Sequence, residues 1–539
     1  MVFCCRCYIF RYIFHVMTKL KLYQLLFLLL IFSNPACTQE ILQRSGDQDI
    51  MTIQAAPTTN PVFKRYPFNP VVRVELKIPD GGPNVPLSSL KGQMEASTLK
   101  MISKLEVFLS SDPKNMEKGK PIGWVIPSGK NFTIPIKGNL NAGQHYIWLN
   151  VVLKDNASMD ATLRLKVDRL TDSSRNKYAI TQNGLTNQRM GFALRKHMDD
   201  GSKAYRIPGL TTTDKGTLIA VYDIRYDHSG DLPANIDVGM SRSTDGGRSW
   251  SPMKTIMDMG GPKDNSGVGD PAVMYDPATK TIWVAALWSK GNRSIAGSGP
   301  GLSPDETGQF MITSSKDDGI TWSKPYSITQ QVKDPKWRIF FPAPGSGIVM
   351  SDGKLVFAAQ YWDANKVPHS TLVYSADHGK TWKSGLGAKS NTTESQLVET
   401  EPGTLLLNMR DNRGKFRSLA TTKDMGQSWT EHPTSSNTLP DPICMGSFIK
   451  ARVKVQGKLQ DVLFFSNPNV SLEPRRDITI KASLDNGLTW APANSLLIDD
   501  RHCDGYSSLT KIDENTLGIL YEGLGRLQYL RVPVKDIVK

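Results

Sequence analysis

Residues 241–250 spell SRSTDGGRSW, a short turn that ends in tryptophan. Four later stretches repeat its order of a hydroxyl residue, an aspartate, a glycine and a tryptophan: SSKDDGITW, SADHGKTW, TTKDMGQSW and SLDNGLTW. The first hydroxyl residues of these five boxes lie 72, 60, 47 and 61 residues apart: Ser243, Ser315, Ser375, Thr422 and Ser483. Repeats of about 60 residues, built from short strands and glycine turns, predict a β-propeller with four-stranded blades, and about six of them fit after residue 191.

The composition of the box explains its shape. Its aspartate can accept backbone N–H groups of its own turn, and its glycine can adopt the positive φ that the turn needs. We expect the tryptophan to pack beneath the hairpin and anchor it to the blade. We therefore predict a structural, non-catalytic role for the five box aspartates: Asp245, Asp317, Asp377, Asp424 and Asp485.

Length and charge narrow the class of protein. The chain has 539 residues, which is too long for one compact core, so two domains are expected. A hydrophobic content of 39% and a charged content of 22% are typical of a globular protein. The net charge of +14 favours an anionic partner. Because lysines and arginines are scattered, with no basic helix or zinc-finger spacing, we expect no nucleic-acid partner.

The amino terminus resembles an export signal. Lys19 and Lys21 precede LYQLLFLLLIF, an apolar run that is long enough for a signal-peptide core and short for a membrane span. Residues 1–37 are therefore predicted to be a leader, and the mature chain to be exported to the periplasm, the outer membrane or the medium. Cys37, at the end of SNPAC, is a candidate for lipidation. The two cysteines outside this leader imply no disulfide framework.

Two β domains are predicted after the leader. Residues 38–180 contain strand-like alternation in NFTIPIKG, QHYIWLNVVL and ATLRLKV, which predicts a small β-sandwich-like domain. Carbohydrate binding and a spacer role are both open for it. Residues 185–539 form the predicted six-bladed propeller. The predicted fold class is all-β.

Five boxes together with YRIPGL at 205–210 resemble the sialidase (exo-α-neuraminidase) family, in particular its secreted bacterial members. The resemblance covers the chain from about residue 191 to the C-terminus. It implies a retaining exo-α-sialidase that hydrolyses terminal sialic acid from glycoproteins, glycolipids and oligosaccharides. The mechanism implied by the resemblance needs no metal. The sequence has no His/Cys/carboxylate cluster with ligand spacing and no glycine-rich phosphate loop, so neither a metal nor a nucleotide cofactor is expected.

The charge of sialic acid explains the arginines that the resemblance implies. The anomeric carbon bears a carboxylate, and the planar guanidinium of arginine binds carboxylates bidentately. Glu522 of YEG resembles the acid that braces the first of three arginines. Arg475 is the alternative to the third, for which Arg476 is preferred because its separation of 30 residues from Tyr506 resembles the family's spacing. The three arginines that match the family are Arg206, Arg410 and Arg476.

The nucleophile follows from the same charge. A carboxylate nucleophile would approach a carbon that already carries a carboxylate, whereas a neutral hydroxyl avoids that repulsion. Tyr506 in CDGYSSL matches the tyrosine of the family. A phenol with a pKa of about 10 needs a base, and Glu394 in TTESQLVE resembles the partner glutamate. The nearby Glu399 is expected to be a strand residue.

The resemblance also implies a catalytic acid/base and the residues that line the substrate pocket. Asp231 in DHSGDLPANIDVG follows Arg206 by 25 residues and resembles the acid/base aspartate on a mobile loop. Asp227 is its competitor, but lies close to the strand end. At one pocket position this chain has an aspartate, Asp223, where a glutamate is expected. The residues predicted to line the pocket are Asp223, Arg225, Asp270 and Gln360.

Two other functions fit parts of the sequence. In a trans-sialidase the glycosyl-enzyme reacts with a sugar instead of water, and the sequence separates this poorly from hydrolysis. A non-catalytic sialoglycan-binding propeller would keep the arginines but lose Tyr506, Glu394 or Asp231, and all three are present. Because all the predicted chemistry lies beyond Gly191, residues 1 to about 180 are expected to be dispensable for cleaving a small sialoside. The linkage preference and the oligomeric state stay open.

Overall fold

The computed structural model of the chain describes residues 51–260, 266–291 and 293–539. The predicted leader and Cys37 lie outside the described residues. The described chain is nearly all β, with only short helices. Within these ranges no helix combines the length and the apolar character of a membrane span. The helical segments are α2 (Ala96–Met101), α3 (Thr329–Val332), α4 (Val534–Ile537), η1 (Met116–Lys118), η2 (Asp199–Gly201), η3 (Ile295–Gly297) and η4 (Pro492–Asn494).

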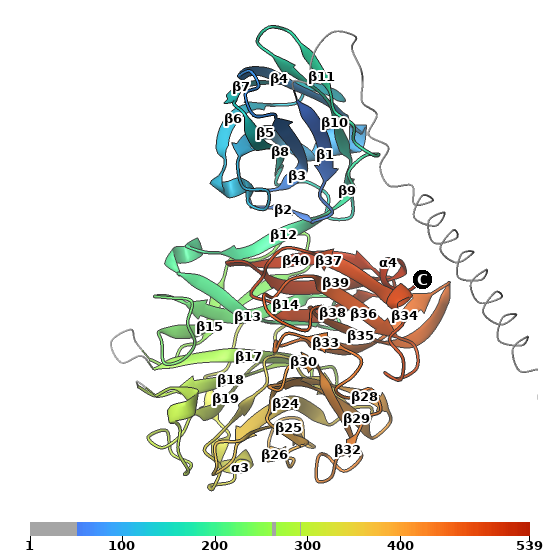
Figure 1. Ribbon diagram of the computed structural model, residues 1–539. Helices are drawn as coiled ribbons and strands as arrows, with labels where there is room; N and C mark the ends of the chain where they lie inside the picture. Colours follow the sequence, from blue (N-terminus) through green and yellow to red (C-terminus); the bar gives the residue numbers. More distant parts are fainter. Residues whose placement is uncertain (1–50, 261–265, 292) are drawn as a thin grey trace, which may run out of the picture. The chain divides into compact units, whose positions relative to one another are not determined.

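The first domain, drawn in blue to teal in Figure 1, is a separate β domain. Nine strands follow one another in the order β1-β3-β8-β5-β6-β7-β4-β10-β11, and one residue pair, Gly123 with Ile136, joins β6 to β7. Side chains along β7 are alternately buried and exposed, as the period of two in the sequence predicts. The strands are β1 (Thr52–Pro57), β3 (Pro70–Ile78), β4 (Val85–Met94), β5 (Ile102–Ser110), β6 (Lys120–Val125), β7 (Asn131–Leu140), β8 (Gly143–Leu153), β10 (Leu165–Asp172) and β11 (Lys177–Ala179).

The second domain, green to red in Figure 1, confirms the predicted six-bladed propeller. The first blade is built from β13 (Ala204–Thr212), β14 (Leu218–Arg225), β15 (Ile236–Ser243) and β16 (Lys254–Met257). The second is built from β17 (Gly267–Asp276), β18 (Thr281–Ser289), β19 (Gln309–Ser315), β20 (Tyr326–Ser327) and β22 (Gly345–Ser346). The third is built from β21 (Ile339–Pro342), β23 (Ile348–Val349), β24 (Leu355–Trp362), β25 (Pro368–Ser375), β26 (Lys383–Ser384) and β27 (Lys389–Ser390).

The next two blades contain β28 (Thr392–Glu401), β29 (Thr404–Asp411), β31 (Ser418–Thr422) and β32 (Thr430–Glu431), and then β34 (Ser447–Val455), β35 (Lys458–Pro468), β36 (Ile478–Ser483) and β37 (Ser495–Asp499). A short pair joins β30 (Lys415–Phe416), which lies between β29 and β31 in the sequence, to β33 (Pro440–Asp441), which precedes β34. Apolar side chains fill the spaces between neighbouring blades. For example, Val221 of β14 and Val273 of β17 belong to one buried cluster.

The last blade closes the ring with strands from both ends of the domain. β38 (Ser507–Asp513), β39 (Thr516–Gly523) and β40 (Arg526–Pro533) come from the C-terminus, and β12 (Gln188–Lys196) pairs with β40 from the other side. β9 (Thr162–Leu163) pairs with the start of β12. β2 (Val62–Lys64) adds a parallel strand to β12, which Figure 1 shows beside it. Phe63 of β2 is fully buried in the core of this blade, so a truncation that removes residues 1–180 would also remove part of this core.

The five boxes fold as their residues predict. In the first box Ser243 Oγ donates to Asp245 Oδ1 (2.8 Å) and accepts from the N–H of Gly247 (2.8 Å), and the N–H of Ser249 donates to Asp245 (3.0 Å). The other four boxes repeat these three hydrogen bonds. The box glycines have φ between 81° and 89°, a region that favours glycine. These contacts account for the boxes as structural turns.

Candidate active site

An arginine–glutamate pair joins the first and last blades. Arg206 of β13 donates to both carboxylate oxygens of Glu522 of β39, from Nε (2.7 Å) and Nη2 (3.1 Å). The same carboxylate accepts the backbone N–H groups of Ile207 (2.8 Å) and Tyr506 (3.1 Å). Burial acts to raise the pKa of Glu522, but Arg206 and these N–H donors outweigh it and hold the pKa below its ordinary value. Glu522 is therefore an ionised brace for Arg206, as the resemblance implies.

Tyr506 and Glu394 meet at a short hydrogen bond. Tyr506 directly precedes β38, and its hydroxyl donates to Glu394 Oε1 on β28. Arg410 of β29 touches both: its Nη1 lies 2.5 Å from Glu394 Oε2 and 3.0 Å from the Tyr506 hydroxyl. Burial and then the Glu394 carboxylate raise the pKa of Tyr506 well above its ordinary value. The phenol is therefore protonated in the free protein, with its proton directed at a carboxylate.

Of the two candidates for the third arginine, Arg475 and not Arg476 lies toward Tyr506. Arg475 donates to the carbonyl of Asp504 (2.8 Å), and a Cβ on Gly505 would lie 2.9 Å from its Cδ, so it packs against the residue before Tyr506. Its side chain is 20% exposed. Arg476 is 49% exposed and pairs with Asp477 (2.9 Å).

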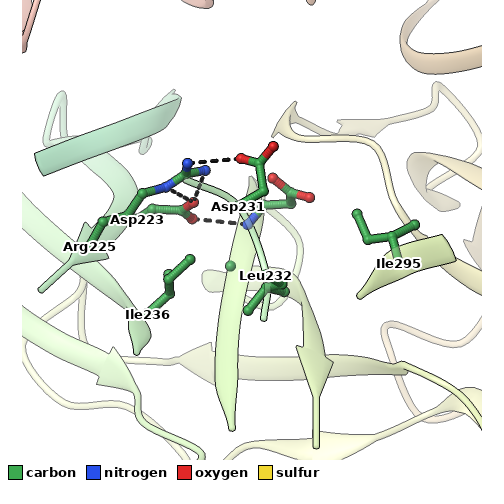
Figure 2. Close-up of a pocket in the computed structure, with 8 residues that line it drawn as sticks. Asp223, Arg225, Asp231, Leu232, Ile236 and Ile295 are labelled. Atoms are coloured by element: carbon green, nitrogen blue, oxygen red, sulfur yellow. Dashed lines mark hydrogen bonds and ion pairs between the residues drawn. The ribbon is translucent and has the colours of Figure 1, made fainter. Parts of the chain in front are cut away.

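A pocket beside these groups collects three of the predicted acidic residues (Figure 2). Asp223 and Arg225 lie two residues apart on β14, so their side chains share one face of the strand. Arg225 donates to Asp223 from Nε (3.1 Å) and Nη2 (2.9 Å), and its Nη1 lies 2.8 Å from Asp231 Oδ1. Asp231 is on the loop between β14 and β15, with 74% of its side chain exposed. An acid at this place can reach a bound ligand from the solvent side.

One wall of the pocket is apolar. Burial raises the pKa of Asp223 to about 6, although Arg225 opposes the shift. Asp223 also accepts the backbone N–H of Asp270 (2.9 Å), which follows a glycine and has a positive φ of 56°. The apolar wall consists of Leu232, Ile236 and Ile295. The sequence motifs, which contain charged and polar residues, did not predict it.

Asp270 connects the pocket to the tyrosine pair. Its pKa is raised well above the ordinary value, first by burial and then by the negative charges of Asp223, Glu394 and Asp231. Because the charges of both Glu394 and Asp231 act on the Asp270 carboxyl, the tyrosine pair and the pocket belong to one site. Gln360 stands apart: it is buried in β24 opposite Phe341, and within the described residues no hydrogen bond joins it to another predicted site residue.

The fold and the site together define a class: an Asp-box propeller with a tyrosine–glutamate pair, adjacent arginines and an exposed acid. A family model described as the BNR repeat-like domain matches residues 207–522, and one described as the N-terminal domain of BNR-repeat neuraminidase matches residues 50–176. The chain belongs to this family, the BNR-repeat neuraminidases or sialidases, which confirms the resemblance carried by the boxes and YRIPGL.

Individual relatives agree with this assignment. A sialidase of Bacteroides fragilis (strain YCH46) is 44% identical over 418 residues, which cover 75% of this chain and 76% of that protein. A sialidase of Micromonospora viridifaciens is 34% identical over 332 residues, covering 60% of this chain and 50% of that protein. The solved structure of a Hadza microbial sialidase superimposes with a TM-score of 0.82 at 40% identity, covering 90% of this chain and 100% of that one.

Proposed function

We propose that the chain is an exo-α-sialidase that hydrolyses terminal sialic acid from sialylated glycans with retention of configuration, through a sialyl–Tyr506 intermediate. The sialidase relatives support the activity and the substrate class. The observation that carries the mechanism is the three-way contact of the Tyr506 hydroxyl with Glu394 and Arg410. It joins a nucleophile, a base and a cation in one place.

Binding would depend on the arginines. The carboxylate of sialic acid is held by Arg206, Arg410 and Arg475, and the braced geometry of Arg206 fixes its plane in advance. Arg206 uses Nε and Nη2 for Glu522, and in the described part of the chain its Nη1 makes no hydrogen bond, so this nitrogen is available to a ligand.

In the first chemical step the Tyr506 oxygen attacks the anomeric carbon while Glu394 takes the phenol proton. The bond from that carbon to the aglycone oxygen breaks, and Asp231 donates a proton to the leaving oxygen. In the second step Asp231 takes a proton from water, the water oxygen attacks the same carbon, and Tyr506 leaves and recovers its proton from Glu394. Two inversions give a product with retained α configuration.

The test is release of sialic acid from a fluorogenic α-sialoside, with NMR detection of the first-formed anomer. We expect the wild type to release the α anomer, and Tyr506→Phe to lower kcat by roughly a thousandfold because the nucleophile is lost. Tyr178→Phe is the control, since its hydroxyl donates to Asp172 in the amino-terminal domain (3.0 Å). A first-formed β anomer would contradict the tyrosyl intermediate, and binding without release would favour the binding propeller.

A further inference from the structure

The amino-terminal domain adds an edge strand, β2, to the last blade of the propeller. The ring of Phe63, on β2, covers Gly191 of β12 so closely that a Cβ on this glycine would lie 2.5 Å from the ring. Phe63 is fully buried in one cluster with Tyr521 and Leu530 of β39 and β40. The sheet that β2 extends is the one that carries Glu522, and Tyr506 comes directly before its strand β38. The segment around β2 is thus part of the blade that carries Glu522 and the strand after Tyr506, at the opposite edge from β38.

Residues of this segment contact Asp500 and Arg501, at the start of the loop that leads to Tyr506, and Arg526 at the start of β40. Asn60 accepts the backbone N–H of Asp500 (3.2 Å), and the guanidinium of Arg501 lies 5.7 Å from the centre of the Phe63 ring. Farther along, the Tyr66 hydroxyl accepts a short hydrogen bond from Arg526, whose guanidinium lies 4.1 Å from the centre of the Tyr66 ring.

These partners are connected to the catalytic groups. Arg501 binds Asp499 with two hydrogen bonds (2.8 and 2.6 Å), and Asp499 also accepts the hydroxyl of Tyr521 (2.9 Å), the neighbour of Glu522 in the sequence. At the other end, Gly525 precedes Arg526, and its N–H donates to Asp504 Oδ2 (3.3 Å). The loop of residues 500–506 is therefore held between two anchors that the amino-terminal segment supports.

The Tyr66 contact is costly to remove. Burial lowers the pKa of Arg526. Within the described residues, the one hydrogen bond of its guanidinium goes to the Tyr66 hydroxyl, which itself donates to Glu117 (2.6 Å). Without it the turn of residues 523–526 would have to move until the guanidinium meets water.

We infer that residues 60–66 of the amino-terminal domain are a positioning element for Tyr506, acting through Arg501 and Arg526. The inference rests on the proposed role of Tyr506 as nucleophile. Displacements of about 1 Å in a reacting group can cost about a hundredfold in rate, so partial release of the loop is expected to affect the chemical step first.

The experiment uses the full chain with Tyr66→Phe and Tyr66→Ala, and Tyr178→Phe as the control from the same domain. We expect kcat on a small sialoside to fall about tenfold in Tyr66→Ala and less in Tyr66→Phe, with KM within about twofold, because Tyr66 touches none of the carboxylate-binding arginines. The control should match the wild type. Melting temperatures identify variants that fail to fold, and Tyr66→Phe, which keeps the ring, guards against that outcome.

Amide hydrogen exchange of residues 500–506 is measured in the same proteins. Faster exchange in Tyr66→Ala than in the wild type, with an unchanged rate in Tyr178→Phe, is expected. Wild-type kcat and wild-type exchange in folded Tyr66→Ala would overturn the inference. A wild-type protein that releases no sialic acid would overturn the proposed function instead, while the exchange rates would still decide whether the segment holds the loop.

Discussion

The box turns and the Tyr506 site both contain carboxylates, but the pKa values of these carboxylates are shifted in opposite directions. In a box, Asp377 accepts hydrogen bonds from residues two and four positions away, and these bonds lower its pKa to about 2. In the site, burial raises the pKa of Asp223 to about 6. A carboxylate whose charge is well solvated by its own turn stabilises the fold, whereas one whose charge is costly is suited to bind or react.

The two regions also differ in the reach of their contacts. Hydrogen bonds of the boxes span two to four residues, but Tyr506 and Glu394 are 112 residues apart in the sequence, and Arg206 and Glu522 are 316 apart. Local contacts depend only on a short stretch of chain. The site exists because six blades bring distant strand ends to one place, so its residues are sensitive to shifts in any of the strands that carry them.

The sharpest test of this contrast compares two neighbouring arginines. We expect Arg475→Met to lower kcat/KM by roughly a hundredfold, because a charged hydrogen-bonding group beside Tyr506 is lost from a site that binds a carboxylate. Arg476→Met, one residue away, removes an exposed arginine that pairs with Asp477, and is expected to stay near the wild type. Steady-state kinetics on a small sialoside measure both.

A larger loss of kcat/KM in Arg476→Met than in Arg475→Met would identify Arg476 as the third carboxylate-binding arginine. It would also show that packing against the residue before Tyr506 does not identify the carboxylate-binding group. Equal losses in both variants would point to the fold of this loop, and not to either guanidinium, as the cause.

Arg475 and Arg476 also show how much of the site can be predicted from the sequence. The boxes were predictable residue by residue because each turn satisfies its own backbone groups. The motif around Arg206 and the loop around Tyr506 were predictable from the family they resemble. Choosing between Arg475 and Arg476 needed the path of the chain into β36, and the membership of β2 in the last blade needed a parallel pairing more than a hundred residues away in the sequence. The spacing of residues along the sequence predicts neither the choice of arginine nor the pairing of β2.

Removing a box carboxylate should affect stability and spare the chemistry. We expect Asp245→Ala to lower the free energy of unfolding by about 1–2 kcal/mol, because the N–H of Ser249 and the hydroxyls of Ser243 and Ser249 lose their acceptor. Chemical denaturation measures the loss, and kcat per folded molecule should be unchanged. Asp513→Ala, which removes a single turn hydrogen bond (2.8 Å to the N–H of Asn515), is the control. Lost activity at native stability would show that the box takes part in catalysis.

The smallest expected effect is a loss of thermal stability at low pH. The pKa of Asp377 is lowered to about 2 by hydrogen bonds from Thr381, and that of Asp424 to about 2 by those from Ser428. Because an unfolded aspartate has a pKa of about 3.9, this stabilisation is complete above about pH 4 and is lost as the pH falls toward 2. The melting temperature should therefore fall over this interval, and less steeply in Asp377→Asn. Identical slopes would show that the box hydrogen bonds do not hold these pKa values.

The central claim, that Tyr506 is the nucleophile, is tested most directly by trapping the intermediate. A sialic acid analogue fluorinated beside the anomeric carbon slows breakdown of the glycosyl-enzyme, so its mass should remain on one peptide after digestion. The account predicts label on the peptide that contains CDGYSSLTK, at Tyr506, and none in Tyr506→Phe. Label on Glu394 or Asp231, or unchanged labelling of Tyr506→Phe, would contradict it.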